Sequence, residues 1–265
     1  MRSVSIKTYL VLTSILIASG FGCRKDICDK EPTLSQGIKL MNTGYFWDPA
    51  ELIYHPCFWL DEKITQLPVP EGKSAFAYGF AETESDLFIA GTFDGTGDVV
   101  SLPCYWKNGI KNNLPTDRFG IFQRCAARDV IIWNGRTFIL GAVDLKPVMW
   151  ILMPDGAVRQ IIIDGQEGTR SASNFIVHDK HLILGGDKMM SSGTGYFFEI
   201  GFWRVTADGV SQWESIEKNL RFATAFAVNA SSGKVLITGE RNVRTNNSLD
   251  SYMSLWSQNG TVTIE

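Results

Sequence analysis

Two segments of the chain share one pattern at one spacing: His55-Pro56-Cys57-Phe58-Trp59 followed by Leu67-Pro68, and Leu102-Pro103-Cys104-Tyr105-Trp106 followed by Leu114-Pro115. A proline, a cysteine, an aromatic residue, a tryptophan and a Leu-Pro pair recur at the same distances, which chance seldom produces. Three further tryptophans extend the series to Trp59, Trp106, Trp150, Trp203 and Trp256, at intervals of 47, 44, 53 and 53 residues. A repeat of this length is typical of propeller or array architectures.

Two more markers accompany the tryptophans. An apolar run precedes each of them and predicts a strand that ends in glycine, at Gly44, Gly91, Gly141, Gly185 and Gly239. An Asn-Gly or Asp-Gly pair follows each of the four later tryptophans and predicts a type I′ hairpin turn, at Asn108, Asp155, Asp208 and Asn259.

A further strand, rich in small residues, opens every repeat except the first. It is predicted at 74–78, 125–130, 172–177 and 223–228. The repeat is therefore a four-stranded antiparallel meander, and the chain is predicted to be all-β: a β-propeller of five such blades over residues 38–265. Only residues 31–36 precede the first repeat, so the first blade is expected to be incomplete and the way the ring closes stays open.

The N-terminus has the pattern of an export signal. Basic Arg2 and Lys7 precede an apolar run over 9–18, which is too short to span a bilayer, and small residues lead to Gly22-Cys23. We predict a signal peptide over 1–22 and a tether over 23–37.

Residues 20–23 resemble the lipobox of bacterial lipoproteins, in the relaxed form found in Bacteroidetes. Gly22 and Cys23 match that pattern, whereas Gly20 and Phe21 depart from it. The resemblance implies lipidation of Cys23, a membrane anchor as partner, and an outer-membrane or cell-surface location. Ordinary signal cleavage, giving a periplasmic or secreted protein, is the alternative.

The repeat itself is similar to that of bacterial propeller-type proteins with a Tyr-Trp-Lys-Asn-Gly motif. Residues 105–109 are the clearest instance here. This resemblance covers about residues 38–265. It implies the fold only, since it brings no substrate and no catalytic residues.

The charge of the chain bears on its binding partners, and its cysteines bear on disulfide formation. A formal net charge of −3 without a basic block argues against nucleic acid as a partner. Besides Cys23, the chain has Cys28, Cys57, Cys104 and Cys125, which allow two disulfides in three pairings. Equivalent positions on neighbouring blades lie about 10 Å apart, beyond the roughly 7 Å that a disulfide spans, so a bond between Cys57 and Cys104 is not favoured. Buried thiols are the alternative.

The sequence predicts no catalytic residues, no metal site and no cofactor. Its three histidines are His55, His178 and His181, and the run 178–181 is interpreted as a solvated turn. No Gly-x-Ser-x-Gly motif or cysteine–histidine metal spacing is present. Acidic residues do follow each glycine marker, and we interpret them as turn residues that bind the local backbone: Asp48, Asp94, Asp144, Asp187 and Glu240.

Three hypotheses for function follow. The first is a non-enzymatic ligand-binding or protein-interaction propeller on the bacterial envelope, with a glycan or a protein as ligand. The series tryptophans would pack between blades, while Trp47, Trp133 and Trp213 lie outside the series and are candidate ligand-binding residues. The alternative is a glycan-active hydrolase that uses carboxylates near the propeller axis. The third, a structural part of an outer-membrane complex, predicts a large exposed apolar patch.

Overall fold

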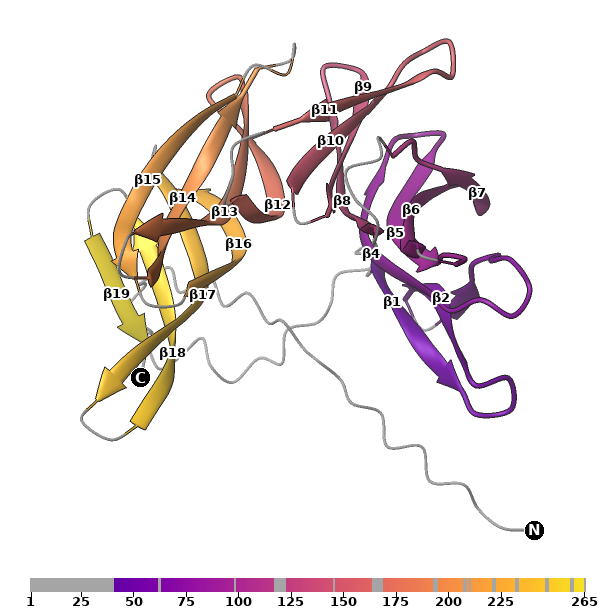
Figure 1. The fold of residues 1–265 in the computed structure, drawn as a ribbon. Helices are drawn as coiled ribbons and strands as arrows, with labels where there is room; N and C mark the ends of the chain where they lie inside the picture. The colour runs from indigo at the N-terminus through magenta and orange to yellow at the C-terminus, as the bar shows by residue number, and fades with distance from the viewer. Residues whose placement is uncertain are drawn as a thin grey trace, which may run out of the picture. The chain divides into compact units, whose positions relative to one another are not determined.

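The computed structural model describes residues 41–264, except 62, 98, 117–122, 145, 164–168, 193–194, 207–208, 210, 221–222, 232–233, 246–247 and 258–259. Every regular element of this part is a β-strand (Figure 1), which confirms the all-β prediction. The described residues accordingly contain no helix that could cross a membrane. The predicted signal peptide and tether, with Cys23 and Cys28, lie outside the described residues.

The described part contains nineteen strands. Their bounds are β1 Met41–Asp48, β2 Ile53–Leu60, β3 Lys63–Gln66, β4 Ala75–Glu82, β5 Leu87–Asp94, β6 Val99–Lys107, β7 Ile110–Asn113, β8 Gln123–Trp133, β9 Arg136–Val143, β10 Lys146–Leu152, β11 Val158–Ile162, β12 Thr169–His178, β13 His181–Ser192, β14 Gly195–Val205, β15 Ser211–Leu220, β16 Ala223–Ser231, β17 Lys234–Thr245, β18 Ser248–Ser257 and β19 Gly260–Ile264.

Consecutive strands pair antiparallel in five runs, which we call units 1 to 5. Unit 1 is the three-stranded sheet β1-β2-β3, and the four later units are β4–β7, β8–β11, β12–β15 and β16–β19. A short parallel pairing of β6 with β8, at Ser101 opposite Arg124, joins units 2 and 3 into one eight-stranded sheet. In Figure 1 the succession runs from the indigo β1 and β2 to the yellow β18 and β19.

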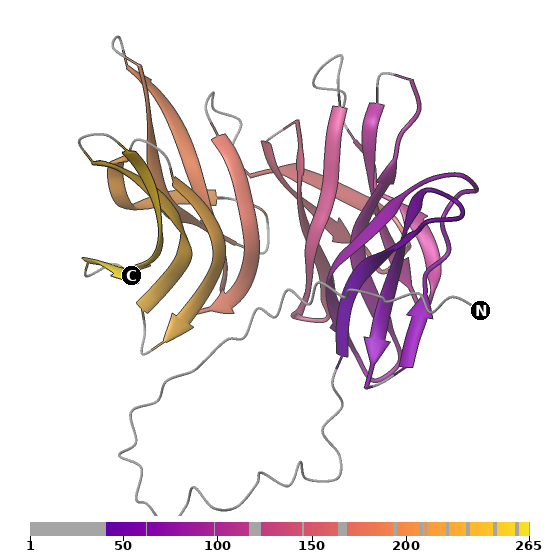
Figure 2. The same ribbon diagram turned by 90° about the horizontal axis from the view of Figure 1, so that it is seen from below.

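The first strands of units 2 to 5, which we call the inner strands, are neighbours in space. β4 contacts β8, β8 contacts β12, and β12 contacts β16, while β1 and β2 of unit 1 lie against β4 (Figure 2). Several of their small residues are buried, Ala75 and Cys125 completely, as expected for crowded strands. No sheet of described strands closes on itself, so the closed five-bladed ring remains a prediction.

The tryptophan marker of a unit packs directly on the glycine marker of the paired strand. A Cβ on Gly91 would lie 2.5 Å from Cζ3 of Trp106. In unit 3 a Cβ on Gly141 would lie 2.7 Å from the same atom of Trp150. The indole of one strand covers the glycine of the strand beside it, and any side chain at the glycine would displace the ring.

The Leu-Pro markers of units 1 and 2 each connect their unit to the next one. The indole Nε1 of Trp106 donates a hydrogen bond to the carbonyl of Pro68, and that of Trp150 donates to the carbonyl of Pro115, both at 2.8 Å. Both indoles are fully buried. The structure thus confirms that these tryptophans pack between units. Trp59 is partly exposed, because no unit precedes it in the described chain.

Unit 4 corrects the position of one marker. Trp203 lies opposite Leu184, as Trp106 lies opposite Ile89 in unit 2. The residue two positions later is Gly186, so the assignment of the marker to Gly185 was wrong by one residue. Two adjacent glycines left both choices open in the sequence.

Units 4 and 5 also correct the placement of two acidic residues. Asp187 lies inside β13 and Glu240 inside β17, whereas both were expected at strand ends. The hairpins β13–β14 and β17–β18 are longer than those of the earlier units, so pairing continues past the glycine.

Candidate functional site

Two of the acidic residues that follow the glycine markers, Asp94 and Asp144, bind backbone groups. Oδ2 of Asp94 accepts a hydrogen bond from the N–H of Ser74 at 3.1 Å, and Oδ1 of Asp144 accepts one from the N–H of Arg124 at 3.0 Å. Both donors lie at the start of the inner strand of the same unit. Each donor lies 20 residues away in the sequence, so these two aspartates bind the backbone of the adjacent inner strand and not that of their own turn, which corrects the expectation that they bind the local backbone.

Asp129 is a buried carboxylate where the inner strands meet. Oδ1 accepts a hydrogen bond from the N–H of Val130 at 2.9 Å, and Oδ2 accepts one from Phe175 of β12 at 3.2 Å. Gly79 of β4 approaches so closely that a Cβ there would lie 2.6 Å from Oδ1. Burial raises the pKa of Asp129 from 3.8 to about 6, although both hydrogen bonds lower it.

The raised pKa of Asp129 predicts a pH-dependent stability. Because the folded state holds this proton more tightly than the unfolded state, the stability that Asp129 contributes is present below about pH 4 and lost as pH rises through about 6. The loss is about 2–3 kcal/mol in the free energy of unfolding. Urea titrations at about pH 4.5 and about pH 7.5 should therefore show a smaller pH difference for Asp129→Asn than for the wild type. Equal pH differences would assign the effect to other carboxylates.

The described cysteines are buried free thiols. Burial raises the pKa of Cys57 and Cys125 to about 11 and that of Cys104 to about 12. Cys57 and Cys104 form no disulfide, which agrees with their expected separation. Thiols with such pKa values hold almost no thiolate at neutral pH and are poor nucleophiles and metal ligands.

Five aromatic side chains of β1, β2 and β4 form one connected surface, which we call the aromatic surface: Tyr45, Trp47, Tyr54, Phe76 and Tyr78. Tyr54 lies at its centre, with its ring centroid 4.8 Å from Trp47, 5.6 Å from Tyr45 and 5.2 Å from Phe76. Tyr45 and Phe76 meet edge to face at 4.7 Å, and Phe76 and Tyr78 lie parallel at 6.5 Å. The exposed fractions are 48% for Tyr45, 46% for Trp47, 41% for Tyr78 and 36% for Tyr54.

Tyr45 is far more exposed than the residue at the matching position of unit 2. In unit 2 the position of Tyr45 is occupied by Thr92, which is 5% exposed and donates a hydrogen bond to the carbonyl of Cys125 in the next inner strand. In unit 1 the described chain supplies no inner strand beside β1, and Tyr45 packs instead against Phe76 of β4. Unit 1 thus presents rings where unit 2 presents a short buried side chain.

The other two candidate tryptophans are less exposed than Trp47. Trp133 is partly buried and packs against Phe138, with ring centroids 5.7 Å apart. Trp213 lies 4.4 Å from Trp203 and has the ammonium of Lys188 4.8 Å from its ring centroid. The structure brings neither into the aromatic surface, and their role as ligand-binding residues remains a prediction.

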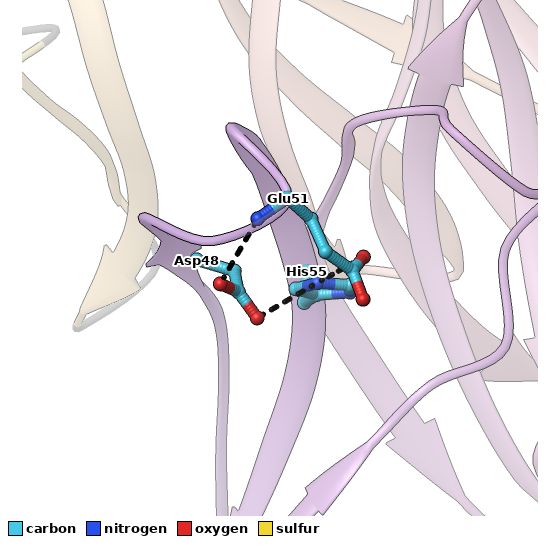
Figure 3. Close-up of side chains that lie close together, drawn as sticks. All are labelled: Asp48, Glu51 and His55. Carbon is cyan, nitrogen blue, oxygen red and sulfur yellow. Dashed lines mark hydrogen bonds and ion pairs between the residues drawn. The ribbon is translucent and has the colours of Figure 1, made fainter.

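Besides the aromatic surface, unit 1 has a group of polar side chains that lie close together at the tip of the β1–β2 hairpin (Figure 3). Nε2 of His55 lies 3.3 Å from Oε2 of Glu51 and 3.7 Å from Oδ2 of Asp48. Nδ1 of the same ring lies 2.9 Å from Nε2 of Gln66. Oδ1 of Asp48 accepts hydrogen bonds from the N–H groups of Ala50 and Glu51, as expected of a turn aspartate.

Sequence analysis did not single out Glu51 and His55 as a site. The repeat did contain a signal, because Leu102 stands in the second repeat where His55 stands in the first. His55 is only 6% exposed. A buried histidine needs polar partners, and here these come from the hairpin tip.

The histidine run 178–181 is a turn, as predicted. Asp179 and Lys180 have φ values of 46° and 60°, which are those of a two-residue hairpin turn between β12 and β13. His178 Nε2 lies 3.3 Å from Oδ2 of the exposed Asp179, a pair without a third ligand among the described residues.

No protein-family model matches the chain, and no curated protein matches its sequence. Solved structures with a similar chain path share little sequence with it. The sucrose-6-phosphate hydrolase of Lactobacillus gasseri is 10% identical with a TM-score of 0.47, covering 83% of this chain and 58% of that one. The N11 neuraminidase-like protein of A/flat-faced bat/Peru/033/2010 (H18N11) is 12% identical with a TM-score of 0.46, over 81% and 67% of the two chains. An exo-1,5-alpha-L-arabinanase from a bovine ruminal metagenomic library is 13% identical with a TM-score of 0.42, over 86% and 93%.

Proposed function

We propose that the protein is a non-enzymatic binding protein of the bacterial envelope, anchored by lipid at Cys23, and that it holds a carbohydrate chain on the aromatic surface. We further propose that units 1 to 5 are the blades of one propeller whose first blade is incomplete. The aromatic surface is the observation that supports the binding function: five rings are in mutual contact, and four of them are more than a third exposed.

The chemistry of the aromatic surface suits a sugar. A pyranose ring has one face of C–H groups and a rim of hydroxyls. The electron-rich face of an aromatic ring attracts polarised C–H groups, while the phenol hydroxyls and the indole N–H can bond to the rim. Tyrosine and tryptophan provide large, rigid contact areas at small entropic cost. Trp47, Tyr45 and Tyr54 offer separate aromatic faces, since the plane of Tyr54 is inclined by 88° to that of Tyr45 and by 57° to that of Trp47.

The exposure of these rings is itself an indication of a binding site. Contiguous apolar patches on soluble proteins mark binding or interaction sites, because they otherwise promote aggregation. The same patch is what the third hypothesis, an outer-membrane complex, requires. We favour the glycan because the faces and polar ends of tyrosine and tryptophan rings match the C–H groups and hydroxyls of a sugar.

Binding is favoured over hydrolysis by the state of the carboxylates. Asp94 and Asp144 each accept a hydrogen bond from the backbone of their own unit, so each has a structural role. Asp129 accepts two backbone hydrogen bonds and is packed against Gly79 of the neighbouring inner strand.

The test is retention of the purified protein on a glycan array and on polysaccharide resins. Trp47→Ala is expected to lower affinity for the retained glycan about thirty-fold, which corresponds to about 2 kcal/mol for a central aromatic contact. The matched control is Trp133→Ala, which removes the same side chain outside the aromatic surface and should leave affinity unchanged.

Three results would contradict the proposal. Binding that survives Trp47→Ala but not Trp133→Ala would move the site to unit 3. Release of a shortened glycan, lost in Asp144→Asn, would favour the hydrolase. A wild-type protein that no glycan retains, but that crosslinks through unit 1 to an envelope protein, would favour a protein partner.

A further inference from the structure

We infer that the tip of the β1–β2 hairpin is a binding site for a divalent cation of the zinc class, with Asp48, Glu51 and His55 as its ligands. The site is independent of the proposed glycan function. Each of the three residues offers one ligand atom, and these atoms all lie within 4.8 Å of one another (Figure 3).

The buried imidazole distinguishes this group from an ordinary acidic surface cluster. His55 is 6% exposed, and its side chain hydrogen-bonds within the described chain only through Nδ1, to Gln66. Nε2 points between the two carboxylates, at ion-pair distance from both. A metal-ligating histidine has this arrangement, in which one ring nitrogen is held by a neighbour and the other faces the ion.

The amide of Gln66 can hydrogen-bond to either neutral tautomer of the His55 ring. With the amide nitrogen toward Nδ1, as in the structure, Gln66 donates to the ring and the proton of a neutral imidazole lies on Nε2. A half-turn of the amide brings its oxygen toward Nδ1. Nδ1 then carries the proton and donates it, which leaves the Nε2 lone pair for the ion.

The distances fit a small tetrahedral ion. Two ligand atoms that are each about 2.0–2.1 Å from a tetrahedral zinc ion lie about 3.3 Å apart. Nε2 of His55 lies 3.3 Å from Glu51 Oε2 and 3.7 Å from Asp48 Oδ2. The third pair, the two carboxylate oxygens, lies within 4.8 Å, so those oxygens need to approach each other by up to about 1.5 Å to enclose the ion.

The two carboxylates differ in their freedom to make that closure. Asp48 uses Oδ1 to bind the backbone N–H groups of Ala50 and Glu51, so its position is defined and Oδ2 faces the histidine. The Glu51 side chain is 60% exposed and can shift at little cost. One ligand is thus rigid, one is buried, and one is adjustable.

The donor set selects the class of ion. One imidazole nitrogen with two carboxylate oxygens suits zinc and its neighbours in the transition series, whereas calcium takes six to eight oxygen ligands. A dication also balances two carboxylates that would otherwise repel each other across a few ångströms. Three protein ligands leave one position of a tetrahedral ion for water or for an oxygen of a bound molecule.

The test is isothermal titration of the full chain, prepared without a polyhistidine tag, with zinc chloride. We expect one ion per chain, and we expect Glu51→Gln to lower the affinity at least about tenfold while leaving the far-ultraviolet circular dichroism unchanged. Glu51 carries the test because its exposed side chain can be changed without disturbing the fold. His55→Ala should abolish binding and is interpreted only if its melting curve remains cooperative.

The matched control is His178→Ala, which removes a histidine paired with one carboxylate only, Asp179. It should leave the zinc affinity unchanged. Titration with cobalt chloride adds a spectroscopic readout, because a nitrogen–oxygen site gives d–d bands without the thiolate charge-transfer band that cysteine ligands produce. The inference is overturned if the wild type binds no zinc, if Glu51→Gln binds as tightly as the wild type, or if the thiolate band appears.

Discussion

Replacing Trp150 with alanine is expected to lower the free energy of unfolding by about 3–5 kcal/mol. The indole is fully buried between units 2 and 3, in one core cluster with Phe88 and Val130. Its loss opens a cavity over Gly141 and removes the hydrogen bond to the carbonyl of Pro115. Both consequences act at a junction between two units, where no other side chain can fill the space without moving a strand.

Urea denaturation followed by tryptophan fluorescence and circular dichroism measures this effect. The matched variant is Trp47→Ala, which removes the same side chain from the aromatic surface. It should lower the free energy of unfolding by only about 1 kcal/mol, since about half of the Trp47 side chain is already exposed. Equal losses in the two variants would show that the repeated tryptophan has no special role between units.

Replacing Gly141 with valine is expected to cost at least about 3 kcal/mol, through overpacking rather than through a cavity. A Cβ at this position would overlap the carbonyl oxygen of Ala126 in β8 and would lie 2.7 Å from Cζ3 of Trp150. The first obstacle is backbone of a paired strand, which cannot turn aside as a flexible side chain can. The variant should therefore separate β8 from β9 locally or displace the indole.

Gly156→Ala is the control for the loss of a glycine. Gly156 lies in the turn between β10 and β11 with a φ of 85°, and a Cβ there meets nothing within 4 Å. It should cost only the strain of the left-handed conformation, about 1–2 kcal/mol. Thermal melts of both variants decide the question, and a smaller loss for Gly141→Val than for Gly156→Ala would contradict the packing account.

Much of the local structure could be predicted from residue chemistry. Asn108-Gly109 and Asn134-Gly135 turn the chain because both pairs accept positive φ values, and all four residues have them in the structure. The period of the tryptophans located the units. The unit 4 glycine was misplaced because register depends on the partner strand, which local sequence does not specify.

The candidate sites show where sequence reasoning ends. Trp47 was singled out because it stands outside the repeat, but the rings that surround it were not. Phe76 comes from a different unit, and it meets Tyr54 only because β4 lies against β1 and β2. His55 was treated as a repeat position rather than as a ligand, because its two carboxylates come from a turn whose conformation is not visible in a pattern of residue types.

What the amino-acid sequence alone determined is the order of strands and turns, since these depend on neighbouring residues: glycine and asparagine at positive φ, and alternation along a strand. Only the tertiary structure decided which side chains act together. Asp129 accepts a hydrogen bond from the N–H of Phe175, 46 residues away, and Tyr45 of unit 1 contacts Phe76 of unit 2. Such contacts depend on the register and packing of strands from different units, and in unit 1 on the absence of an inner strand from the described chain. The interaction energies of these contacts arise between distant segments, so a local sequence pattern does not predict them.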